Sequence, residues 1–184
     1  MPTGYPAQGW SPGYAVPPAA PKPGSGLRLT ALLLAIAGGV VVIVACLLPY
    51  AHYPSSVSGP HAPSILNPGP AAALWFAAEP VGVALVAIAA GIVLVVSSSQ
   101  AARWTTAGVL LAFGIQTPLL FAGYLFGIAF GSGFHQGPAG AVGILGGLLL
   151  LAAGILGLVG TAVSQRAAGQ PGGTAAPGGA VTLG

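Results

Sequence analysis

The chain has 184 residues, of which 55% are hydrophobic and 3% are charged, and its formal net charge is +3. A soluble surface carries roughly 25 to 35% charged residues, so this composition excludes a water-soluble domain and indicates membrane-spanning helices. The positive charge comes from four residues placed singly along the chain, which excludes the basic patch of a nucleic-acid-binding protein. They are Lys22, Arg28, Arg103 and Arg166.

Both ends of the chain are poor in residues that can form a core. Residues 1–26 and 167–184 consist largely of Pro, Gly and Ala. Such segments bury too little surface to offset the loss of chain entropy on folding. We therefore expect two disordered tails that flank a transmembrane domain at 27–166.

Four apolar runs make up that domain, each near the ~20 residues that a helix needs to cross a ~30 Å hydrocarbon core. None of them alternates strictly between apolar and polar residues, as the strands of a membrane barrel do. The sequence therefore predicts an all-α fold, an integral membrane four-helix bundle. The expected spans are about 28–49, 71–97, 106–131 and 139–163.

The first run contains the single cysteine of the chain, and residues 43–46 match the lipobox of a bacterial lipoprotein. Cleavage before Cys46 would remove the first helix. However, a long Pro-rich tail precedes the run, and the apolar residues continue through Leu48, past the cleavage point. We therefore expect the first helix to be retained, with Cys46 as a small buried residue, and a lipoprotein is the alternative.

The four positive residues fall on one side of the predicted membrane. Lys22 and Arg28 precede the first span, Arg103 lies between the second and third, and Arg166 follows the fourth. The positive-inside rule assigns their side to the cytoplasm. The sequence thus predicts a multi-pass protein of the cytoplasmic membrane with both termini in the cytoplasm and the loops at 51–70 and 131–138 outside.

The second run holds the only acidic side chain, Glu79, in the stretch WFAAEP. Trp75 marks the outer interface, so Glu79 lies one turn or ~6 Å deeper. In an alternative register the helix starts at Pro80, and Glu79 caps it in the headgroup region. In the deeper register the carboxyl needs a polar neighbour. We expect it to pack toward the bundle near Gln116 and Tyr124 of the third run, with Tyr124 the nearer contact.

Glycines recur at helix-packing intervals in the third and fourth runs. The third contains a GxxxGxxxG motif, and the fourth carries a seam of glycines at heptad positions. Small residues let the backbones of two membrane helices approach closely. We expect these glycines to pack the bundle internally, with homo-oligomerisation as the alternative. The candidate packing residues are Gly123, Gly127, Gly131, Gly140, Gly147 and Gly154.

Three histidines, His52, His61 and His135, all map to the outer loops. Neutral imidazole is the commonest protein ligand for metals. However, no carboxylate or thiol is near them in the sequence, and no two share a helical i, i+3 or i, i+4 spacing. The spans contain no histidine that could serve as an axial haem ligand. We therefore expect solvated loop histidines, no metal site and no cofactor.

Several stretches together resemble a known group of proteins. The Pro/Gly/Tyr-rich tail is followed by a first span that closes on LLPY, a second that opens on WFAAEPVGVAL, and a third that carries GIQTPLLFAGYL. This arrangement resembles the small four-span membrane proteins of actinobacterial type, over about residues 1 to 165. The resemblance implies the same four-span architecture and no particular activity.

The residues that would carry chemistry are few. The sequence has no nucleophile paired with a base, no metal-ligand set and no phosphate-binding loop, so we expect no enzyme. Transport usually needs several intramembrane polar groups or paired broken helices, and only Glu79, Gln116 and two prolines qualify. We therefore favour a non-catalytic interaction or accessory protein that contacts the lipid bilayer and a membrane protein or a second copy. A small proton-coupled transporter or channel subunit that uses Glu79 is the alternative.

Overall fold

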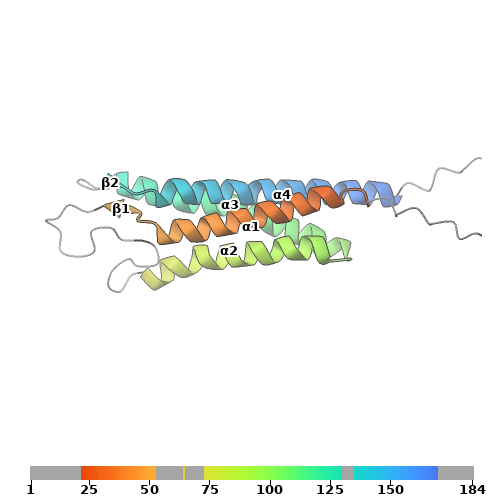
Figure 1. Ribbon diagram of the computed structural model, residues 1–184, viewed down its shortest axis with the longest axis horizontal. Helices are drawn as coiled ribbons and strands as arrows, with labels where there is room; N and C mark the ends of the chain where they lie inside the picture. Colours follow the sequence, from red (N-terminus) through yellow and green to blue (C-terminus); the bar gives the residue numbers. More distant parts are fainter. Residues whose placement is uncertain (1–21, 53–63, 65–72, 130–134, 170–184) are drawn as a thin grey trace, which may run out of the picture.

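A computed structural model describes residues 22–52, 64, 73–129 and 135–169 of the chain (Figure 1). Four helices account for nearly all of them: α1 Ser25–Leu47, α2 Ala73–Val96, α3 Gln100–Ala129 and α4 Ala139–Gly169. Each is long and apolar enough to cross a membrane. The prediction of an all-α, four-helix membrane bundle is therefore confirmed. Most of the two predicted tails and of the loop at 51–70 lies outside the described residues.

The helices form a ring in which neighbours in sequence are also neighbours in space. α4 packs closely against α1 and α3, whereas α2 packs on α1 and α3 and lies diagonally across from α4. Figure 1 shows the helices running alternately along one axis. Residues 22–25, 97–99 and 164–169 lie at one end of the bundle, the tail end, and two short strands lie at the other, the strand end.

The two strands join loops that are far apart in the sequence. β1 Ala51–His52 pairs with β2 His135–Gln136 in antiparallel register, with Ala51 opposite Gln136 and His52 opposite His135. Beyond the strands, Gly137 N donates to Tyr50 O at 2.9 Å. The sequence did not predict this pairing, because two-residue strands are too short to leave an alternating pattern. The pairing fastens the end of α1 to the start of α4.

Helix α1 ends two residues before the predicted limit of the first span. Leu48 has φ −78° and ψ 151°, which is extended backbone. A residue that precedes proline is pushed out of the helical region, and Pro49 follows it. At the other end, Gly24 has φ +78°, and a Cβ on it would collide with Gly160 O of α4. Glycine at position 24 thus allows α1 to start in contact with α4.

The interior of the bundle is built mostly from small residues, with a few large ones such as Phe121 and Leu150, and many large apolar side chains lie on its surface. Fully buried positions in α1 and α2 include Ala31, Ala35, Ala45, Ala84 and Ala87. Large apolar side chains that face outward include Leu33, Leu47, Leu85, Leu119 and Phe126. Lipid solvates apolar side chains as well as a protein core does, so helix association depends on close approach. This distribution of sizes suits a bundle whose solvent is the bilayer.

Glycines of α4 bring α3 into direct contact. Gly140 lies against Leu125, Gly147 against Pro118 and Gly154 against Leu111. These three residues of the predicted packing set therefore lie in the α3–α4 interface.

The GxxxGxxxG motif of the third apolar run does not show the same close packing at its first glycine. Gly123 is exposed and has no atom within 4 Å of the place where a Cβ would stand, so it makes no packing contact within the described bundle. Gly131 and the contacts of Gly127 lie outside the described part of the chain.

Candidate functional site

The single carboxyl group of the chain is hydrogen-bonded across two helices. Gln116 Nε2 in α3 donates to Glu79 Oε1 in α2 at 2.9 Å. At 1.5 Å per residue, Glu79 lies roughly 25 Å along the helix axis from Val96, and Gln116 lies a similar distance from Gln100. The two residues are thus at the same level. Because the hydrocarbon core is ~30 Å thick, this level is in the half of the bundle nearer the strand end.

The pair lies on the outer surface of the bundle. Both Glu79 and Gln116 are exposed, whereas the next residues along each helix, Pro80 and Thr117, are buried. The sequence predicted that the carboxyl packs toward the bundle near Gln116, and the structure places it beside Gln116 with both side chains exposed. The hydrogen bond to Gln116 forms at the surface, between α2 and α3.

The position of Glu79 follows from the buried stripe of α2. Pro80, Ala84 and Ala87 are buried at helical spacing, and they define the face that packs against the other helices. Adjacent residues of a helix are about 100° apart around its axis. Glu79 therefore lies at the side of that face, where α2 meets α3. Since α2 begins at Ala73, Glu79 lies inside the helix and does not cap it.

Glu79 can accept a further hydrogen bond. Within the described residues, the contact with Gln116 is the only hydrogen bond of the Glu79 side chain, and it occupies Oε1. A carboxylate has two oxygens and about four acceptor positions. Tyr124, the third residue of the predicted polar site, lies in α3 about two turns nearer the strand end. Its side chain is outside the described set. The pair Glu79–Gln116 is thus the part of the predicted site that the structure brings together.

The histidines lie at the strand end, away from the polar pair. His52 and His135 are exposed and stand opposite each other in the β1–β2 pairing, and His61 falls outside the described residues. Among the residues that the structure describes, no group of three or more His, Cys, Asp or Glu could hold a metal ion. The expectation of no metal site stays a prediction.

Cys46 lies inside α1 and is fully buried. The helix continues beyond it to Leu47. It belongs to the hydrophobic core of the bundle, which is the usual setting of a structural cysteine.

The fold and the polar pair define a class, a multi-pass helical membrane protein with one hydrogen-bonded carboxyl on its outer surface. Comparisons of the chain with models of protein families, with curated proteins and with solved structures give no match.

Proposed function

We propose that this chain is a non-catalytic interaction or accessory protein of the cytoplasmic membrane, which binds a second membrane protein through the Glu79–Gln116 pair. The observation that supports this proposal is the exposure of the only acidic side chain on the surface of the bundle. Lipid tails offer no hydrogen-bond donor to a carboxyl oxygen, so a carboxyl at this level is costly. A polar side chain from the helix of a partner, or of a second copy, would satisfy it.

The exposure of Glu79 also bears on the transport alternative. Carboxyl groups that relay protons across membranes face the interior of a bundle or a water-filled cavity. Glu79 lies outside the buried stripe of α2 and is exposed where lipid or a partner would cover it. This geometry favours contact with another protein over proton movement through the bundle.

The partner interface can be tested by photo-crosslinking in intact cells. Ile115 and Leu119 flank Gln116 on the exposed side of α3, with 51% and 67% of their surfaces exposed. A benzophenone amino acid at either position should crosslink to a partner, and the crosslinks should be lost on Glu79→Leu. Leu148 of α4 is a matched control, because it is 50% exposed on a helix that barely contacts α2. Equal crosslinking at all three positions, or none at any of them, would contradict the proposal.

The orientation is the second part of the proposal. The tail end carries Lys22, Arg28, Arg103 and Arg166, and positive residues favour the cytoplasmic side. Single cysteines at Ser98 and His52, each in a Cys46→Ala background, place one thiol at each end of the bundle. An impermeant maleimide added to intact cells should label position 52 and spare position 98. The reverse pattern would overturn the orientation.

A further inference from the structure

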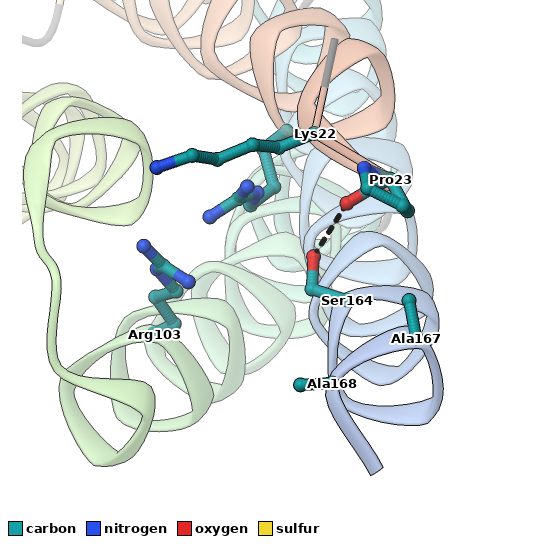
Figure 2. Close-up of a pocket in the computed structure, with 7 residues that line it drawn as sticks. Lys22, Pro23, Arg103, Ser164, Ala167 and Ala168 are labelled. Atoms are coloured by element: carbon teal, nitrogen blue, oxygen red, sulfur yellow. Dashed lines mark hydrogen bonds between the residues drawn. The ribbon is translucent and has the colours of Figure 1, made fainter. Parts of the chain in front are cut away.

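Three positive side chains from two distant parts of the sequence meet in one cavity at the tail end. The cavity has a volume of about 370 Å³ and lies between the segment before α1, the start of α1, the start of α3 and the end of α4 (Figure 2). Lys22, Arg28 and Arg103 line it, and we call it the basic pocket. Its size is within the ~300 to 1,000 Å³ of small-molecule sites. Its other lining residues are Pro23, Ser164, Ala167 and Ala168.

The two arginine side chains of the basic pocket are held by hydrogen bonds to backbone carbonyl groups. Arg103 Nε donates to Ser97 O at 2.8 Å, and Arg28 Nε lies 3.4 Å from Gly24 O, to which it donates. The terminal nitrogens of both guanidinium groups stay available to a ligand. Ser164 Oγ donates to Pro23 O at 2.9 Å, which ties the segment that carries Lys22 to α4 (Figure 2). The pocket is therefore formed before any ligand binds.

The positive charges of the pocket have no counter-ion in the described protein. Arg28 is only 7% exposed, and its charge and that of Arg103 repel each other. The one acidic side chain of the chain, Glu79, is bonded to Gln116 roughly 25 Å away along α2. A buried charge is costly unless it is paired. An anion from outside the protein would remove this cost.

A smaller cavity extends the basic pocket with polar groups. It has a volume of about 140 Å³ and shares Arg103, Ser164 and Ala168 with the basic pocket. Hydroxyl and amide side chains at its wall can bind the hydroxyl groups of a ligand. They belong to Ser98, Gln100, Thr161 and Gln165. The two cavities together match an anion that also carries hydroxyls.

We propose that the basic pocket binds a phosphate-bearing anion, with the headgroup of an anionic phospholipid as the favoured source. Guanidinium groups bind phosphate through paired, charge-assisted hydrogen bonds. The pocket lies where the apolar helices end, which is the level of the headgroups, and basic pockets between membrane helices are known to hold anionic lipid headgroups. This inference is independent of the proposed partner and of the direction in which the protein is inserted.

Binding to the purified full-length chain in neutral detergent tests the proposal. After removal of bound lipid, native mass spectrometry would compare short-chain phosphatidylglycerol, short-chain phosphatidylcholine and inorganic phosphate. We expect phosphatidylglycerol to bind roughly tenfold tighter than the net-neutral phosphatidylcholine, and to bind more weakly as salt is raised. Equal affinity for phosphatidylglycerol and inorganic phosphate, with mutual competition, would support the site and assign it to a free phosphate. Equal affinity for the two lipids, without phosphate binding, would refute it.

Matched variants separate the pocket from general attraction between charges. Arg28→Gln and Arg103→Gln should each weaken phosphatidylglycerol binding roughly tenfold, and Arg103→Lys should weaken it less. Arg166→Gln removes the same charge from an exposed position of α4 that does not line the pocket, and it should have little effect. If Arg166→Gln weakens binding as much as Arg103→Gln does, the pocket is not the binding site.

A variant outside the helices tests the pocket without changing any residue of the helices. Lys22 is exposed and precedes α1, so Lys22→Gln should leave the thermal unfolding of the protein unchanged. The proposal requires that this variant also bind phosphatidylglycerol more weakly than the Arg166→Gln control. Unchanged binding in a normally folded Lys22→Gln would contradict the role of Lys22.

Discussion

His52 and His135 stand directly opposite each other across the β1–β2 pair, so the residues that follow α1 are held against those that precede α4. Gly137 N donates to Tyr50 O two positions further along, and Ala139 N donates to Pro49 O. These hydrogen bonds thus join α1 to α4 at the strand end of the bundle. The same two helices also pack closely along their length.

This pairing predicts a specific disulfide. Opposed residues of an antiparallel pair have Cα atoms about 4.5 to 5.5 Å apart, within the range that a disulfide spans. The double substitution His52→Cys and His135→Cys, in a Cys46→Ala background, should therefore oxidise to one intramolecular bond. Intact-mass measurement after alkylation would count the remaining thiols. The pair His52→Cys with Gln136→Cys is the control, because neighbouring strand residues point to opposite faces, and it should stay reduced.

The glycine seam of α4 predicts a loss of stability on a one-carbon substitution. In Gly154→Ala the added methyl would stand 2.6 Å from Leu111 N and 2.7 Å from its Cα, so the backbone of α3 would have to move. Overpacking of this kind costs about 1 to 3 kcal/mol. Thermal unfolding in detergent, followed by circular dichroism, would measure the change.

Gly123→Ala is the matched control for that substitution. No atom lies within 4 Å of the new methyl, and alanine is favoured over glycine in a helix by up to about 1 kcal/mol. Its unfolding temperature should stay the same or rise. A fall instead, together with a smaller particle by light scattering, would show that Gly123 packs against a second copy of the chain.

The Glu79–Gln116 hydrogen bond predicts a small effect on stability. Hydrogen bonds between membrane helices are worth about 0.6 kcal/mol on average. Glu79→Gln keeps an acceptor for Gln116 and should unfold like the unmodified protein, whereas Glu79→Leu should lose about that amount. Gln116→Leu should match Glu79→Leu, and the double variant should lose no more, because both remove one shared interaction. A loss of several kcal/mol would contradict the surface position of Glu79.

The same Glu79 variants test the alternative that the protein is a proton-coupled transporter. In proteoliposomes, neither the unmodified protein nor the Glu79 variants should drive uptake of a solute in response to a pH gradient. Uptake by the unmodified protein that disappears in Glu79→Gln would favour the transporter over the accessory protein.

The burial of Cys46 predicts an unlipidated, unreactive thiol. Cys46 is fully buried within α1, so maleimide should label it only after unfolding in a denaturing detergent. The intact mass of the purified protein should include the residues before Cys46 and no lipid. A diacylglyceryl adduct on a chain that begins at Cys46 would instead establish the lipoprotein alternative.

The helices were predictable because their determinants are local. A run of ~20 apolar residues must satisfy its backbone groups internally in a bilayer, and a helix does so. The apolar run alone did not give the end of α1. Leu48, before Pro49, is extended and ends the helix while the apolar run continues.

The arrangement of the sites was less accessible from the sequence. α2 is apolar around its whole circumference apart from Glu79, so periodicity does not tell which face is buried. Arg28 and Arg103 were read as signs of orientation, and their meeting in one pocket depends on how α1 and α3 pack on α4. Gly160 contributes to that packing, because a Cβ there would stand 3.1 Å from Arg28 Cγ.

Small residues inside and large residues outside reverse the usual pattern of mutational tolerance. In a water-soluble protein, the surface accepts most substitutions and the interior requires bulk. Here an outward Leu33 or Leu85 can be exchanged for another apolar side chain with little loss of contacts inside the bundle, whereas Gly147 or Gly154 leaves no room for one more carbon. Under mutational drift, the smallest residues of this chain should therefore be the slowest to change.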